Sequence, residues 1–207
     1  MTALKKGLLV AIEGTDGTGK STQALRLKQH FSDQGLETKY LREPTDGKYG
    51  REIRRLAQEG RHQVTPEEEM ELFIMDRIED CEKNIHPALA NHELIIIDRY
   101  YFSTIAYQGA LGLDTDEIWK RNETIAIIPD MVLILDMPIE KALQRITQQR
   151  GDTHDDFEKA DFLHKAQAIF QSMNRSYIHH LSADRDPDEV FEEMRDLITE
   201  LIVEYKV

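Results

Sequence analysis

Eight residues near the start of the chain have the types and the spacing of a loop that binds nucleotide phosphates. Residues 14–21 read Gly-Thr-Asp-Gly-Thr-Gly-Lys-Ser, which fits the pattern G-x-x-x-x-G-K-[ST]. Glycines permit the tight turn and the close approach that backbone N–H groups need around an anion. In such a loop Lys20 would reach the β- and γ-phosphates, and the Ser21 hydroxyl would ligate Mg²⁺. We therefore expect a nucleoside triphosphate to bind here; a glycine-rich connecting turn is the alternative interpretation.

The residues around this loop are of the kind that it requires. The apolar run Leu8–Ile12 precedes it and predicts a buried strand. Ala24, Leu27 and Phe31 follow at helical spacing, and Gly35 is placed to cap the end of that helix. The sequence thus predicts a strand, the loop and a helix in the order that a phosphate site needs.

The composition limits the classes of partner. The 207 residues carry a net charge of −13, which argues against nucleic acid or an acidic membrane as the main partner. A phosphate substrate must approach through this repulsive field, so we expect arginines to gather at the site. Cys81 is the sole cysteine, which excludes a disulfide framework and a cysteine-based zinc site and suits the cytosol. The apolar run before Glu13 is too short for a signal peptide or a membrane span.

Strands and helices are expected to alternate along the rest of the chain. Leu94–Ile97 and Met131–Leu135 are continuous apolar runs, typical of strands buried on both faces. Thr38–Leu41 and Ile178–Ser182 predict two further strands. This alternation predicts an α/β fold, with a parallel sheet covered by helices on both faces. No linker divides residues 1–207, so we expect a single domain, with a mobile lid at about residues 148–158, where the sequence becomes polar.

One predicted helix carries an unusual charge. It begins at Thr65, the expected N-cap, with Glu68 placed for a capping box. Its apolar stripe extends from Met70 to Ile85 and includes Phe73, and Arg77 falls within that stripe four residues after Phe73. A charge there must be paired or must face a cleft, and the pattern favours the cleft. Phe73, taken alone, is more often a core residue than a platform for a base.

Polar residues stand where the predicted strands end. They are the loop at 14–21, Arg42-Glu43, Asp98-Arg99 and Asp136. Ligands of parallel α/β sheets bind beyond the carboxyl ends of the strands. We therefore expect these residues to meet in one active site.

These residues, in their order and spacing, resemble the thymidylate kinases, a family of nucleoside monophosphate kinases. The resemblance runs from about Leu8 to about Ile202. It rests on Ile12-Glu13-Gly14 with the loop, Arg42-Glu43-Pro44, Phe73 with Arg77, Asp98-Arg99-Tyr100 with Ser103, Ala106, Tyr107 and Gln108, and Pro129-Asp130 with Leu135-Asp136. It implies a three-layer fold with a five-stranded parallel sheet. It also implies a cytoplasmic homodimer that uses Mg²⁺ and transfers the ATP γ-phosphate to dTMP, giving dTDP and ADP for dTTP biosynthesis.

The resemblance also implies roles for individual residues. The residues that would bind ATP are Gly14, Thr15, Asp16, Gly17, Thr18, Gly19, Lys20, Ser21, Thr22 and Arg185. Those that would bind dTMP are Asp16, Arg42, Phe73, Arg77, Arg99, Ser103, Tyr107 and Gln108. The catalytic group would be Lys20, Asp16, Arg99, Arg150 and Arg145, and Ser21 with Asp98 would hold the metal.

Within the dTMP set, the resemblance implies a separate task for most side chains. Asp16 would orient the sugar 3′-hydroxyl, and Arg42 and Arg99 would grip the acceptor phosphate, for which the planar guanidinium is well suited. The two aromatic residues would contact the base and the sugar. Phe73 would stack on the pyrimidine, and Tyr107 would lie under the deoxyribose. Arg77 would donate to a ring carbonyl of the base, and Gln108 would also lie near the base.

The sequence departs from the family pattern at two places. Members supply a positive charge to the transferring phosphoryl group either from the loop or from the lid, and this loop has Gly17 at that position. The lid would then have to supply this charge through Arg145 and Arg150. The acidic residues Asp155-Asp156 occur where a further arginine is usual. The usual Gly-Gly after Glu-Pro is Thr45-Asp46.

Two alternative functions stay open at this point. One is a kinase for another deoxynucleotide or for a deoxynucleoside, since the lid and Thr45-Asp46 differ from the usual form. The other is a nucleotide-dependent regulatory P-loop protein. The Asn-Lys-x-Asp run by which GTPases recognise guanine does not occur in the sequence.

Overall fold

The computed structural model describes residues 4–60, 64–150 and 156–206, and within them no side chain from 149 to 159. A five-stranded sheet, with strand order β2-β3-β1-β4-β5, forms its centre. Every pairing between neighbouring strands is parallel. The strands are β1 (Leu8–Gly14), β2 (Thr38–Arg42), β3 (Leu94–Asp98), β4 (Met131–Asp136) and β5 (Ile178–Ser182). The predicted α/β class and parallel sheet are confirmed.

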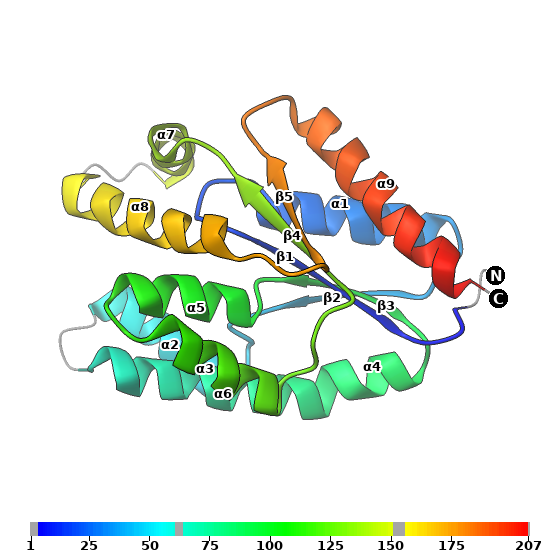
Figure 1. The fold of residues 1–207 in the computed structure, drawn as a ribbon, viewed down its shortest axis with the longest axis horizontal. Helices are drawn as coiled ribbons and strands as arrows, with labels where there is room; N and C mark the ends of the chain where they lie inside the picture. The colour runs from blue at the N-terminus through cyan, green and yellow to red at the C-terminus, as the bar shows by residue number, and fades with distance from the viewer. Residues whose placement is uncertain (1–3, 61–63, 151–155, 207) are drawn as a thin grey trace.

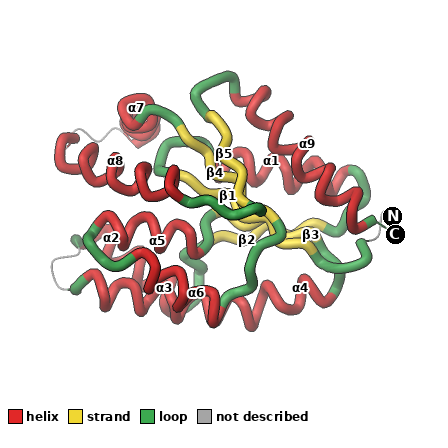
Figure 2. Tube along the Cα trace, in the orientation of Figure 1, coloured by secondary structure: helices red, strands yellow, loops and turns green. Residues whose placement is uncertain are grey.

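Helices cover both faces of this sheet (Figures 1 and 2). They are α1 (Lys20–Asp33), α2 (Lys48–Glu59), α3 (Pro66–Asp80), α4 (His86–Ala90), α5 (Tyr101–Ala110), α6 (Thr115–Ile125), α7 (Ile139–Arg150), α8 (Asp156–Ser172) and α9 (Pro187–Tyr205). Helices α1 and α9 pack on one face, and α3, α5 and α8 contribute to the core on the other. The two ends of the described chain lie side by side, where the Lys5 amide donates to the Tyr205 carbonyl at 2.8 Å.

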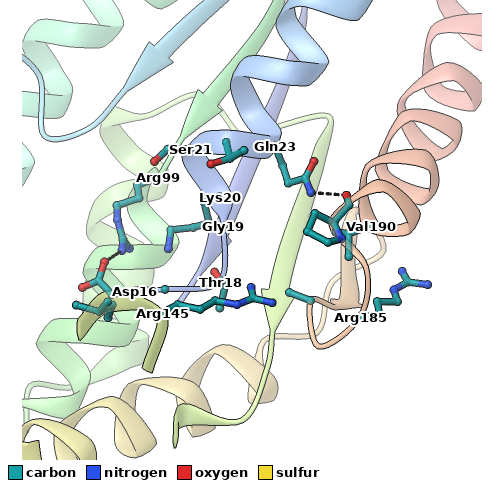
Figure 3. Close-up of a pocket in the computed structure, with 15 residues that line it drawn as sticks. Asp16, Thr18, Gly19, Lys20, Ser21, Gln23, Arg99, Arg145, Arg185 and Val190 are labelled. Carbon is teal, nitrogen blue, oxygen red and sulfur yellow. Dashed lines mark hydrogen bonds and ion pairs between the residues drawn. The ribbon is translucent and has the colours of Figure 1, made fainter. Parts of the chain in front are cut away.

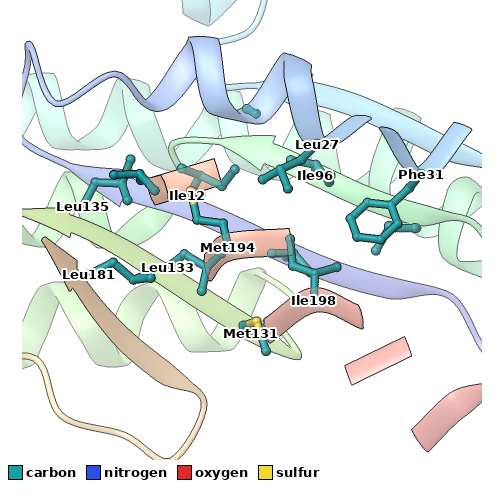
Figure 4. Close-up of a cluster of buried hydrophobic side chains, with 14 of the residues drawn as sticks. Ile12, Leu27, Phe31, Ile96, Met131, Leu133, Leu135, Leu181, Met194 and Ile198 are labelled. Carbon is teal, nitrogen blue, oxygen red and sulfur yellow. The ribbon is translucent and has the colours of Figure 1, made fainter. Parts of the chain in front are cut away.

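The apolar residues of the strands divide between these two faces. On β1, Leu8, Val10 and Ile12 belong to the core beneath α1 and α9, whereas Leu9 and Ala11 belong to the opposite one. Alternate side chains of a strand point to opposite faces, so a strand covered on both sides must be apolar throughout. Figure 4 shows the first of these cores, where side chains from the sheet meet those of α1 and α9. The continuous apolar runs in the sequence follow from this double burial.

The third helix begins as predicted but ends differently. Thr65 accepts from the Glu68 amide at 3.2 Å and Glu68 accepts from the Thr65 amide at 2.9 Å, so the capping box is present. The apolar stripe predicted one helix as far as Ile85. Instead, a π-helical turn, Cys81–Ile85, separates α3 from α4. Pro87 follows at the start of α4, and its missing N–H and its ring disfavour a continuous α-helix through this point.

The segment expected to form a lid overlaps two helices. Residues 148–150 end α7, residues 156–158 begin α8, and residues 151–155 lie outside the described residues. None of the described helices combines the length and the apolar character needed to cross a membrane.

Candidate active site

The phosphate-binding loop connects the central strand β1 to the first turn of α1. Gly14 and Gly19 have φ angles of 131° and 92°, in a region that residues with a Cβ rarely adopt. The Thr15 carbonyl accepts from the Lys20 ammonium at 2.7 Å and from the Thr18 hydroxyl at 2.9 Å, which closes the loop on itself. The predicted strand, loop and helix are therefore present, and the amino end of α1 faces the site, where its partial positive charge favours an anion.

A cavity of about 490 Å³ opens over this loop (Figure 3). Residues 16–23 line it together with Arg99, Arg145, Arg185 and other residues of α7, of α9 and of the loop before α9. Within the described part of the chain, its lining contains four cationic side chains, Lys20 among them, and one carboxylate, Asp16. The expected gathering of positive charge is thus observed, against the net charge of −13. We call this space the donor cavity.

Gly17 brings the loop against α7. Its φ is 86°, and a Cβ at this position would overlap the backbone carbonyl of Ala142 in α7. The loop and the helix that carries Arg145 therefore touch through backbone atoms, with no room for a side chain between them.

Lys20 is held in an environment that weakens its proton binding. Burial of the ammonium, together with the nearby charge of Arg99, lowers the pKa of Lys20 to about 8, although Asp16 and Asp98 oppose this shift. Near neutral pH the side chain is charged, and a modest rise in pH deprotonates it.

We expect the rate to fall at alkaline pH for this reason. The protonated ammonium attracts phosphate, so kcat/KM for the triphosphate should decrease about tenfold per pH unit above pH 8, where free Lys20 loses its proton. At saturating triphosphate the bound phosphates stabilise the charge, and kcat should fall only at higher pH. A rate profile from pH 6.5 to 10, with circular dichroism as a control for folding, measures both. A flat kcat/KM up to pH 9.5 would contradict this account of Lys20.

A second cavity, of about 330 Å³, adjoins the donor cavity. Phe73, Ser103, Tyr107 and Gln108, all predicted from the sequence, line it. Asp16 and Arg99 line both cavities, which therefore meet at these residues. We call this second space the acceptor cavity.

Arg99 connects the two cavities through a network of hydrogen bonds. Its guanidinium donates to Asp16 Oδ1 at 2.6 Å and to Ser103 Oγ at 2.8 Å, and it lies over the ring of Tyr107. Its φ is 69°, an uncommon backbone conformation for a residue with a side chain, and such residues cluster at functional sites.

The buried carboxylate of Glu13 holds in place Tyr100 and Ser103, two residues next to Arg99. It accepts from the Tyr100 amide at 2.7 Å and from the Ser103 amide and hydroxyl at 3.2 and 2.6 Å. Burial raises the pKa of Glu13, while the charge of Arg99 and the bond from Ser103 oppose the shift. Glu13 thus fixes the first turn of α5, and through Ser103 it fixes one side of the Arg99 guanidinium.

The two predicted metal ligands lie together. The Ser21 hydroxyl donates to Asp98 Oδ2, and Tyr40 donates to the same oxygen at 3.3 Å. Asp98 Oδ1 is buried and has no hydrogen-bond partner among the described residues. An unpartnered buried carboxylate oxygen is costly unless something binds it. Hard oxygen ligands in this small number fit a divalent cation that keeps water and phosphate oxygens as its other ligands.

Some predicted residues lie elsewhere. Arg42 ends β2 and lines a third cavity, next to Asp80 and Lys83, so the structure does not bring it to the acceptor cavity. Arg150 is the last residue of α7, and its side chain lies outside those described.

Arg77 is almost completely buried in the body of the protein. It forms an ion pair with Glu43 and a hydrogen bond with Asn122. It also donates to Thr104 at 3.3 Å, and Thr104 lines the acceptor cavity. The charge in the apolar stripe is therefore paired, and the cleft that the pattern favoured is not where it lies, because Thr104 stands between the guanidinium and that cavity.

Loss of Arg77 should destabilise the fold. Burial raises the pKa of Glu43, and the positive charge of Arg77 opposes this shift. In Arg77→Ala this carboxyl would remain buried without its partner, at a cost of about 3–5 kcal/mol in the free energy of unfolding. Urea denaturation measures the loss. Arg121→Ala is the matched control, because its ion pair with Glu71 is exposed and should contribute less than about 1 kcal/mol. Equal losses in both variants would contradict the prediction.

Several lining residues could not be identified from the sequence. Arg54 donates to the Pro44 and Thr45 carbonyls at 2.8 and 2.6 Å and lines the acceptor cavity. Additional lining residues are Ile53, Glu69, Leu111 and Phe162. Glu69, directly before the apolar stripe of α3, is a buried carboxylate, but only the packing of α3 on α5 reveals its position.

Sequence comparisons identify relatives of this chain among known proteins. A sequence model of the family described as thymidylate kinase matches residues 12–194. The chain is 45% identical to the thymidylate kinase of Desulfotalea psychrophila over 195 residues, which are 94% of each chain. It is 39% identical to that of Brachyspira hyodysenteriae, over 94% of this chain and 95% of the relative. For the thymidylate kinase of Akkermansia muciniphila the identity is 40%, over 96% and 94%.

Proposed function

The chain belongs to the thymidylate kinase family, and from this premise we propose that it transfers the γ-phosphate of ATP to dTMP, giving dTDP and ADP. One observation carries the proposal beyond the family: two cavities of different lining share a wall made by Asp16 and Arg99. A kinase needs such a pair of sites, because a phosphoryl group must pass in line between two bound nucleotides.

The chain contributes mainly alignment and charge to this reaction. Phosphoryl transfer requires little covalent help, and its barrier falls when cations surround the oxygens of the transferring group. Lys20 and the loop amides would hold the ATP phosphates, and Arg185 and Thr22 would complete the donor site. Arg145, which lines the donor cavity, and Arg150 would bring further positive charge from α7.

The acceptor cavity would hold dTMP. Phe73 supplies a ring for stacking on the base, and Tyr107 lies beside the guanidinium of Arg99, which would bind the acceptor phosphate. Asp16 would orient the 3′-hydroxyl of the sugar. For a base contact, the Arg77 side chain would have to extend past Thr104. For a phosphate contact, the side chain of Arg42, the last residue of β2, would have to leave the third cavity.

We further propose that the divalent cation is Mg²⁺. Ser21 and Asp98 would hold it, and Asp98 Oδ1 offers a buried oxygen that lacks a partner among the described residues. When bound, Mg²⁺ would neutralise charge on the β- and γ-phosphates of ATP. Activity measured after removal of metal and after addition of Mg²⁺, Mn²⁺ or Ca²⁺ tests this choice.

A panel of acceptors tests the function. ADP release should be fastest with dTMP when ATP is combined in turn with dTMP, dUMP, UMP, dCMP, dAMP and dGMP. Turnover with another monophosphate and none with dTMP would refute the substrate assignment. Hydrolysis of ATP that no monophosphate accelerates would indicate a regulatory ATPase instead.

A homodimer and a cytoplasmic location complete the proposal. The resemblance supports the dimer, and light scattering should then give twice the chain mass of 24.0 kDa. The sole cysteine, Cys81, is free and buried, which fits a reducing compartment.

A further inference from the structure

Two buried polar side chains of the acceptor cavity are bonded to each other. Glu69 comes from α3 and Gln108 from α5, and both line the cavity. Gln108 Nε2 donates to Glu69 Oε2 at 3.0 Å. Each residue is only 2% exposed, so water has little access to either group.

The chemistry of the pair fixes the orientation of the glutamine. A carboxylate can only accept hydrogen bonds, whereas an amide has one end that donates and one that accepts. Glu69 therefore holds the NH₂ end of Gln108, and the carbonyl end is left for other partners. Gln108 Oε1 is buried and has no hydrogen-bond partner among the described residues. A buried acceptor without a partner is costly, and because Gln108 lines this cavity, a ligand bound there is the candidate for the missing donor.

We propose that Glu69 is a specificity-determining residue, which acts by orienting Gln108 so that the cavity accepts pyrimidines with a hydrogen on ring N3. This inference rests on the proposed function. Thymine and uracil carry N3–H and can donate to Gln108 Oε1. Cytosine has an unprotonated N3, so two acceptors would face each other and a buried group would stay unsatisfied. Sites built on such pairing reject the mismatched ligand strongly.

Neutralising Glu69 removes this constraint. In Glu69→Gln the new amide can donate to Gln108 Oε1, which allows Gln108 to turn its NH₂ end toward the base. The preference for dTMP over dCMP, as a ratio of kcat/KM values, should then fall roughly tenfold or more. The preference for dTMP over dUMP should change by less than about twofold, since both bases carry N3–H. Glu67→Gln, the same substitution at an exposed position of α3, is the matched control and should leave both ratios unchanged.

The outcomes separate this inference from the proposed function. An unchanged dTMP-to-dCMP ratio in Glu69→Gln, with dTMP still phosphorylated, would overturn the role of Glu69 alone. If Glu69→Gln does not fold, Glu69→Met, which also removes the acceptor, gives the same comparison. The wild-type protein provides an independent check, because equal use of dCMP and dUMP would overturn the inference without any variant. If the wild type does not phosphorylate dTMP, the proposed function fails; calorimetric binding of dTMP, dUMP and dCMP to wild type and variant then decides the inference separately.

Discussion

Replacing Lys20 by alanine should lower kcat/KM for ATP by at least about 10³-fold. The ammonium lies in the loop between β1 and α1, donates to the Thr15 carbonyl and lines the donor cavity. It is largely buried, so water screens its attraction for phosphate only weakly. Alanine leaves the loop amides and the helix dipole in place. It removes the positively charged side chain of the loop, which attracts the phosphoryl group during its transfer.

Lys28→Ala is the matched control for this variant. Lys28 lies on the same helix, two turns further along, and does not line the donor cavity. The control should retain nearly full activity, and both variants should keep the thermal stability of the parent. A loss of less than about tenfold in folded Lys20→Ala would show that the amides and arginines suffice, and would remove Lys20 from the mechanism.

Replacing Arg99 by alanine should also lower turnover by about 10³-fold, with a different kinetic signature. Because Arg99 lines both cavities, its loss should raise KM for dTMP and also lower kcat. Arg99→Lys should restore little, since a single ammonium cannot reproduce the forked contacts with Asp16 and Ser103.

Two further arginines, Arg54 and Arg195, serve as comparisons for Arg99→Ala. Arg54 lines the acceptor cavity alone, so Arg54→Ala should affect dTMP kinetics and leave KM for ATP unchanged. Arg195 pairs with the adjacent Asp196 on α9, away from both cavities, and Arg195→Ala should behave as the parent. If Arg99→Ala changed the kinetics of one substrate only, the position of Arg99 in the wall between the two cavities would not contribute to catalysis.

The parts of the site that local sequence determines could be predicted. The loop at 14–21 depends on glycines and on the strand and helix beside it, all of which are contiguous in the chain. Asp98 and Arg99 could be placed because the carboxyl ends of parallel strands share one edge of the sheet. The capping box of Thr65 and Glu68 is likewise a local signal.

What depends on packing between distant helices could not be predicted. The stripe around Arg77 indicated a charge that must be paired or must face a cleft, but nothing in it pointed to Glu43, 34 residues earlier, as the partner. Phe162 reaches the acceptor cavity from α8, more than 100 positions after the loop. The π-helical turn before Pro87 was missed for a different reason, since hydrophobic spacing does not distinguish it from an ordinary helical turn.

The contact between Gly17 and Ala142 limits how this enzyme can evolve. An arginine at position 17 would place the missing positive charge directly in the loop, yet its Cβ would overlap the Ala142 carbonyl and its backbone would be strained. A single substitution therefore cannot introduce this arginine, because α7 would have to move first. We expect descendants of this sequence to keep glycine at position 17 for as long as α7 keeps its place, and to change the two elements together.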